Sequence, residues 1–300
     1  MAALEFDLPG VRIGVAEYEA GPTGCTVFAF DRPLAASADV RGGSPGTMLA
    51  EDIGLLRAVC FAGGSLLGLE AVTGVASELF AQRGHEHVDW GDVPAVGGAI
   101  LFDFDRPNGV YPDKALGAAA LAAARPGYCP TGRVGAGRNV RVGKGAAGLS
   151  SEPGGQGAAI RSLGRAKVLA VVVVNALGAV VDRRGQVVRG HLHPQTGQRL
   201  DLHTWLGQGE DAAGTQGNTT LTLLLTNQKM SPPALRQVAR QVHASMGRSI
   251  QPFHTSFDGD VLFAVTTGEV DEPALRDPSS LGVLAAEAVW DAVLDAVAHD

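Results

Sequence analysis

The sequence predicts a layered α/β or α+β sandwich with helices on both outer sides. Stretches with helical periodicity alternate along the chain with short runs of β-branched and aromatic residues. Several of these runs are apolar at every position, which is typical of strands buried on both faces. With 300 residues, 45% of them hydrophobic, the chain can bury a large core, and we expect residues 1–300 to form a single domain.

The first half of the chain contributes two predicted strands and three predicted helices. Residues 25–30 and 96–104 are rich in β-branched and aromatic side chains, which favour strands. Apolar residues spaced three and four apart predict helices over residues 48–59 and 66–80. An alanine-rich stretch predicts a third helix over residues 114–124.

The second half begins with a glycine-rich segment. Residues 132–159 contain nine glycines and have no sustained periodicity, so we expect a long loop there. A second glycine-punctuated loop is expected over residues 207–217. The remaining elements are strands over residues 168–174, 219–226 and 261–267, a helix that begins after Ser231, and a last helix over residues 281–297.

Composition excludes several classes of partner. The formal net charge is −7, so the chain has no basic surface for nucleic acid or anionic lipid. The longest apolar run, residues 168–174, is far shorter than the roughly 20 residues of a membrane helix. We find no secretory signal pattern at the beginning of the sequence and expect a cytoplasmic protein. Cys25, Cys60 and Cys129 are expected to be reduced and structural, since they are odd in number and widely spaced.

Two cofactor patterns are present only in part, and we expect no cofactor and no metal. The segment before Lys144 resembles a phosphate-binding loop, but five residues separate its glycines and Gly145 follows the lysine in place of Ser or Thr. Two histidine pairs would suit a zinc-binding structural protein if the fold joined them. Surface histidines are the favoured interpretation for this set, His85, His87, His191 and His193.

The junction between Asn218 and Thr219 carries the strongest chemical signal. It lies where a flexible loop meets an apolar strand. If the bond were cut, the α-amine of Thr219, with an ordinary pKa of about 7.7 to 8, could act as general base to its own hydroxyl. Asp258 and Asp260 form a turn before the next strand, and an extended backbone would place both carboxylates on one side, where they could orient a nucleophile.

Longer segments around this junction resemble a known family. The chain is similar throughout to the self-processing N-terminal-nucleophile hydrolases, which include the L-aminopeptidase/D-esterase, the β-aminopeptidases and the nylon-oligomer hydrolases, and it is most similar to the last type. The matching segments are Leu8-Pro-Gly-Val-Arg-Ile-Gly, Val110-Tyr-Pro-Asp-Lys-Ala-Leu-Gly, Val134-Gly-Ala-Gly, Gly217-Asn-Thr-Thr, Met230-Ser-Pro and Gln251-Pro-Phe-His-Thr-Ser-Phe-Asp-Gly-Asp.

The resemblance implies a four-layer αββα sandwich made as an inactive precursor. It implies self-cleavage between Asn218 and Thr219, which gives an α chain of residues 1–218 and a β chain of residues 219–300. It also implies a homotetramer that hydrolyses linear amides such as 6-aminohexanoate oligomers or nylon. Aminopeptidase activity on small peptides, and acyl transfer of the ornithine acetyltransferase type, remain alternatives. The residues matched to the family's site are Thr219, Lys144, Asn175, Asp258, Asp260 and, as a substrate contact, Tyr111.

Each matched residue suits a step of amide hydrolysis. Thr219 would attack the carbonyl and form an acyl-enzyme ester. Lys144, on a glycine-rich loop, would stabilise developing negative charge, and the Asn175 amide would donate to the oxyanion. Asp258 and Asp260 would orient Thr219 and titrate as a coupled pair.

Overall fold

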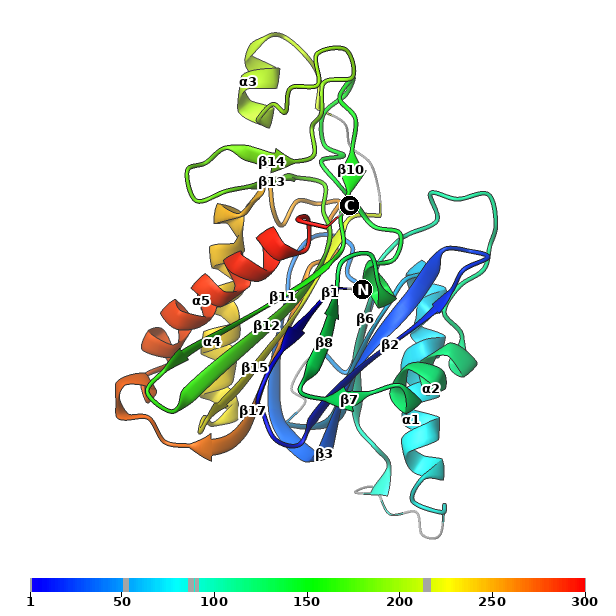
Figure 1. The fold of residues 1–300 in the computed structure, drawn as a ribbon, viewed down its shortest axis with the longest axis vertical. Helices are drawn as coiled ribbons and strands as arrows, with labels where there is room; N and C mark the ends of the chain where they lie inside the picture. Colours follow the sequence, from blue (N-terminus) through cyan, green and yellow to red (C-terminus); the bar gives the residue numbers. More distant parts are fainter. Residues whose placement is uncertain (1, 51–53, 86–88, 90–91, 213–216, 300) are drawn as a thin grey trace.

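Two layers of strands lie between two layers of helices in the computed structural model, which describes residues 2–50, 54–85, 89, 92–212 and 217–299 (Figure 1). Both strand layers belong to one sheet whose main path runs β11-β12-β15-β17-β3-β5-β6-β4, and β2 branches from β3 and pairs in turn with β7. Helices α4 and α5 cover one outer face, and α1 and α2 cover the other. The predicted αββα sandwich is therefore confirmed.

The first strand layer contains the end of the sheet that carries Thr219. Strand β15 lies between β12, to which it is antiparallel, and β17, to which it is parallel. Alternate side chains of β12 point to opposite faces: Leu169 and Val171 enter the central core, whereas Val168 and Ala170 pack under the helices. This layer consists of β11 (Gln156–Leu163), β12 (Ala166–Asn175), β15 (Thr219–Gln228) and β17 (Val261–Val270), covered by α4 (Pro232–Ser245) and α5 (Pro278–Asp295).

The second strand layer is linked to the first through the long strand β3. The first half of β3 pairs with β2 and β5, and its last residues pair with β17. The central core between the layers contains Phe28, Phe61 and Phe263, which come from three different strands. This layer consists of β2 (Val11–Tyr18), β3 (Thr23–Val40), β5 (Gly54–Ala62) and β6 (Val96–Ile100), covered by α1 (Leu69–Ala81) and α2 (Lys114–Ala122).

Short elements complete the chain. The segment from β13 to α3 forms a small projection at the top of Figure 1. The short strands are β1 (Ala2–Glu5), β4 (Thr47–Met48), β7 (Arg125–Pro126), β8 (Tyr128–Thr131), β9 (Arg141–Val142), β10 (Glu152–Pro153), β13 (Ala179–Val181), β14 (Val187–Arg189) and β16 (Ile250–Gln251). The short helices are η1 (Ser65–Gly68), η3 (Gly135–Gly137), α3 (Leu202–Gly207), η4 (Met246–Arg248) and η5 (Pro273–Leu275).

The predicted helix over residues 48–59 is wrong. Residues 54–62 form β5, between β3 and β6. Both faces of β5 are buried over its second half, so apolar residues occur at nearly every position and include spacings of three and four by chance. Two boundaries also differ: β6 ends at Ile100, not at residue 104, and the glycine-rich loop ends where β11 begins at Gln156.

Most of the remaining predicted elements are confirmed within a few residues, but the strand predicted over residues 25–30 is much longer, because β3 continues to Val40 and pairs there with β17. Helices α1, α2, α4 and α5 and strands β12, β15 and β17 all overlap the predicted ranges. Ser231 caps α4, because its side chain accepts a hydrogen bond from the Ala234 N–H. No helix among the described residues is long and apolar enough to cross a membrane.

Candidate active site

Thr219 is the first residue of β15 and is almost completely buried, with 4% of its surface exposed. Its backbone pairs with Asn175 at the end of β12. The Thr219 hydroxyl Oγ1 donates to the carbonyl oxygen of Asn218, at 2.5 Å. The same oxygen accepts the backbone N–H of Gly259, at 2.8 Å. The carbonyl oxygen of the peptide bond between Asn218 and Thr219 thus accepts one hydrogen bond from a hydroxyl and one from a backbone N–H.

A positive group lies on one side of this bond. The Nζ atom of Lys144 lies 3.1 Å from the backbone oxygen of Asn175, 3.2 Å from its Oδ1 and 3.4 Å from the Gly217 oxygen. The Asn175 Nδ2 donates to the oxygens of Phe102 and Gly217, at 2.9 and 3.0 Å. Burial disfavours the charged amine and lowers the pKa of Lys144 to about 8. The glycine-rich loop therefore delivers a weakly basic lysine beside the junction.

The two acidic residues, Asp258 and Asp260, lie on the other side of the bond between Asn218 and Thr219. Asp258 is 1% exposed, and its Oδ2 accepts from the N–H and hydroxyl of Thr255, at 2.8 and 2.6 Å. Asp260 is completely buried, and its Oδ1 accepts the N–H of Thr220, at 2.7 Å. Burial is the main cause that raises the pKa of Asp260 to about 6. The Asp260 carboxylate therefore contacts the N–H of the peptide bond that joins Thr219 to Thr220.

The structure thus brings together five of the six predicted site residues. Lys144 and Asn175 come from the segment before the junction, and the two aspartates follow β16. Tyr111 makes its hydrogen bond elsewhere: its hydroxyl donates to Glu70 on α1, at 3.1 Å. The role of Tyr111 as a substrate contact stays a prediction.

Two residues of the site were missed by sequence reasoning. Gly259 donates its N–H to Asn218, and a Cβ atom added at Gly259 would lie 2.6 Å from the Ser44 oxygen and 3.0 Å from the Thr219 hydroxyl. His254 lies 2.9 Å from Asp260, measured from Nδ1 to Oδ2. Both residues occur inside the segment that resembles the family, but the resemblance implies roles only for the aspartates of that segment.

The structure does not support a zinc site made from two histidine pairs. The expectation of surface histidines is also wrong for His191, which is completely buried. His87 lies outside the described residues. His85 follows α1, whereas His191 and His193 follow β14, and these two parts of the fold lie at opposite ends of the molecule in Figure 1. Across the ranges that the structure describes, no group of three or more His, Cys, Asp or Glu side chains could hold a metal.

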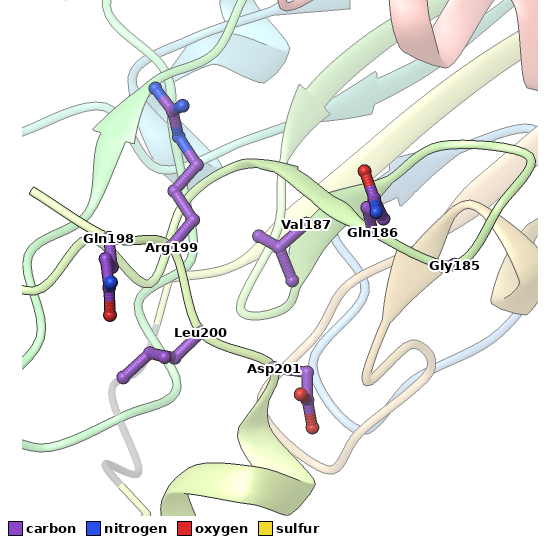
Figure 2. Close-up of a pocket in the computed structure, with 7 residues that line it drawn as sticks. All are labelled: Gly185, Gln186, Val187, Gln198, Arg199, Leu200 and Asp201. Atoms are coloured by element: carbon purple, nitrogen blue, oxygen red, sulfur yellow. The ribbon is translucent and has the colours of Figure 1, made fainter.

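A cavity of about 520 Å³ lies in the projection, lined by residues 185–187 and 198–201 (Figure 2). None of the predicted site residues lines it. The side chain of Arg199 points away from Val187 and Asp201, and it forms an ion pair with Glu152 at 2.6 Å. We therefore place the candidate active site at Thr219, where polar groups converge, and not at this cavity.

Comparison with known proteins identifies the family of the chain. The sequence model of peptidase family S58 matches residues 6–300. The chain belongs to peptidase family S58. A 6-aminohexanoate-oligomer endohydrolase of Paenarthrobacter ureafaciens is 45% identical, over 98% of this chain and 85% of its own length. An uncharacterised aminopeptidase of Mycobacterium tuberculosis is 33% identical, over 97% of this chain and 92% of its own length.

Solved structures similar to this S58 peptidase share its fold. The L-aminopeptidase D-Ala-esterase/amidase of Ochrobactrum anthropi, described as a variant of the N-terminal-nucleophile hydrolase fold, superimposes with a TM-score of 0.67 at 16% identity. A β-aminopeptidase of Burkholderia sp. gives 0.66 at 20% identity. Each match covers 96% of this chain and 84% of the other. The fold of this S58 peptidase is therefore that of the N-terminal-nucleophile hydrolases.

Proposed function

We propose that the chain cleaves itself between Asn218 and Thr219 and then uses Thr219 to hydrolyse linear amides. The observation that carries the proposal is the pair of hydrogen bonds at the Asn218 carbonyl oxygen, from the Thr219 hydroxyl and from the Gly259 N–H. A nucleophile and an oxyanion donor at one buried peptide are the elements of an acyl transfer site.

In the self-cleavage step, the Thr219 oxygen attacks the Asn218 carbonyl carbon. The Gly259 N–H, already on the carbonyl oxygen, stabilises the negative charge that develops there. The C–N bond then breaks and the hydroxyl proton passes to the leaving nitrogen, which becomes the α-amine of Thr219. Water hydrolyses the resulting ester. The products are an α chain of residues 1–218 and a β chain of residues 219–300, which remain one domain.

In the processed enzyme, the new α-amine accepts the proton of the Thr219 hydroxyl as it attacks a substrate amide. Lys144 and the Asn175 amide stabilise the tetrahedral intermediate, and their present hydrogen bonds to the Gly217 oxygen support this role. Asp260, bonded to the Thr220 N–H, fixes the first residues of the β chain. Asp258 contributes negative charge that favours the ammonium form of the amine.

The substrate that we propose is an oligomer of 6-aminohexanoate. The support is the 45% identity over 98% of the chain with a relative named for that activity. An apolar surface beside the junction agrees with an aliphatic chain: Phe102 is 38% exposed and contacts Phe104 edge to face. It also packs against Gly217, where an added Cβ would lie 2.8 Å from the ring.

Aminopeptidase activity on small peptides is the second candidate, favoured by the aminopeptidase relative at 33% identity. A homotetramer and a cytoplasmic location also remain proposals. Cys25, Cys60 and Cys129 are all buried and free, which supports a reducing compartment.

Denaturing electrophoresis with N-terminal mass analysis tests the self-cleavage. We expect the wild type to give two fragments, the smaller beginning at Thr219, and Thr219→Ala to give one. Assays with 6-aminohexanoate oligomers and with small peptides, each with and without an added amine acceptor, then rank the substrates and separate hydrolysis from acyl transfer. A wild-type chain that stays intact while hydrolysing amides would contradict the proposed mechanism.

A further inference from the structure

His254 has an unusual backbone close to the proposed nucleophile. It lies between β16 and Asp258, and its φ angle is +59°, in the left-handed region that is uncommon outside glycine and that His, Asn and Asp adopt more often than other side chains. Its side chain is 18% exposed and packs edge to face on His243, with ring centroids 4.4 Å apart. The contact with His243 and the hydrogen bonds of the ring hold the residue in this conformation.

The hydrogen bonds of the His254 ring fix its orientation. Nε2 lies 3.3 Å from the backbone oxygen of His243, which can only accept, so Nε2 carries a hydrogen and donates. Nδ1 lies 2.9 Å from Oδ2 of Asp260, and one proton bridges these two atoms. The histidine is thereby bound at one end to α4 and at the other to the buried carboxyl group.

The chain of contacts continues to the nucleophile. The second oxygen of Asp260, Oδ1, accepts the N–H of Thr220, the residue that follows Thr219. Resting on the function proposed above, we propose that His254 is a positioning residue. The hydrogen bond from His254 to Oδ2 of Asp260 orients the carboxyl group so that Oδ1 accepts the Thr220 N–H. This contact holds the backbone of Thr219 in the position from which its hydroxyl attacks.

The charged groups around His254 and Asp260 explain how the hydrogen bond between these two residues affects the pKa of Asp260. Asp258 is next to Asp260 on the same turn and raises its pKa, while the hydrogen bond from His254 opposes the effect of burial. From α4, His243 faces His254 and is bonded to Asp39 at the end of β3, at 2.9 Å. Arg41 in turn pairs with Asp39, at 2.6 Å. Without the His254 bond, the Asp260 carboxyl would retain its proton to a higher pH.

Two substitutions of His254 that are isosteric with each other test the proposal. Both Asn and Asp tolerate a left-handed backbone. His254→Asn places an N–H donor near the position of Nδ1, whereas His254→Asp presents a carboxylate to Asp260. We expect His254→Asp to slow self-cleavage and to lower kcat about 10- to 100-fold, the range for a lost hydrogen bond to a charged group. We expect KM to be unchanged and the acid limb of the pH profile to move to higher pH.

We expect His254→Asn to keep both rates within about threefold of the wild type, because the donor is retained. His85 offers a matched control: it is exposed, has a φ angle of +54° and lies in the turn after α1. His85→Asn and His85→Asp should leave cleavage and the pH profile unchanged. If His254→Asp does not fold, His254→Ala replaces it, since it removes the donor without adding a charge.

The outcomes separate the two proposals. Equal rates in the wild type and in His254→Asp would overturn the positioning role, as would equal losses in both His254 variants with an unmoved acid limb. A wild-type chain that neither cleaves itself nor hydrolyses amides would instead overturn the proposed function, and this inference with it.

Discussion

The two sides of Thr219 differ in charge and in the kind of backbone that carries them. The side formed before the junction holds a cation, Lys144, on a glycine-rich loop, and 37 of the 41 glycines precede Thr219. The side formed after it holds two carboxylates, Asp258 and Asp260, with His254 behind them. The proposed cut would separate these two sides into different chains.

The difference indicates that the two sides of Thr219 have different roles in the reaction. The groups on the cationic side contact the backbone oxygens of residues 175 and 217, so they are placed to stabilise negative charge on a carbonyl oxygen. The groups on the anionic side contact amides, among them the Thr220 N–H, so they hold the nucleophile's own backbone. Variants that affect one side only can test this division.

Lys144→Met should have the largest effect. It removes the buried cation beside Asn175, and we expect kcat for amide hydrolysis to fall about 100- to 1000-fold, as for other lost electrostatic donors. Steady-state kinetics on processed protein measure it. Lys167→Met is the control, since this lysine pairs with an exposed Asp7 remote from Thr219. Full activity in Lys144→Met would remove the cationic side from the mechanism.

The two sides should also give opposite slopes of stability against pH. The folded chain releases the Lys144 proton at about pH 8, whereas the unfolded chain keeps it to the ordinary 10.5. Between these values the unfolded state binds more protons, so the free energy of unfolding rises with pH, by about 3 kcal/mol. Asp260 keeps its proton to about 6 in the folded chain and loses it at 3.8 in the unfolded chain. Stability therefore falls by about 3 kcal/mol from pH 4 to 6.

Urea unfolding in the uncleaved Thr219→Ala background measures both slopes. Lys144→Met should lack the alkaline rise and keep the acid fall, and Asp260→Asn should do the reverse. If either variant lost both slopes, the two sides would be coupled and the division between them would fail.

Gly259→Ala should have a smaller effect, and it tests an oxyanion donor that comes from the segment after the junction. The added Cβ would lie 2.6 Å from the Ser44 oxygen, so the backbone must shift and the N–H leaves the Asn218 oxygen. We expect self-cleavage to slow by about tenfold, measured by gel densitometry over time. Gly247→Ala is the control, because nothing lies within 4 Å of a Cβ there. An unchanged rate in Gly259→Ala would exclude this N–H as an oxyanion donor.

Tyr111→Phe should have the smallest effect. The hydroxyl is hydrogen-bonded to Glu70 on α1 and belongs to neither side, so we expect kcat and KM to change by less than about threefold. An increase in KM of tenfold or more, with kcat unchanged, would instead support the predicted substrate contact and extend the site toward α1.

Much of the fold could be predicted from the sequence, because the residue pattern that identifies each helix or strand is local. The continuous apolar run of β12 and the Ser231 cap of α4 are both patterns of residues close in the chain. The failure at β5 has the opposite cause: one of its faces packs into the central core and the other packs under α1, and its own periodicity reveals neither.

The sequence by itself determined the nucleophile candidate and its acidic partners. The hydroxyl at a loop-to-strand junction, and two carboxylates in one short turn, are properties of neighbouring residues. The tertiary structure alone decided that Lys144 reaches Asn175, that Gly259 donates to Asn218, and that His254 contacts Asp260. The reason is sheet pairing: β15 lies between β12 and β17, and their registers bring together segments that are remote in the chain.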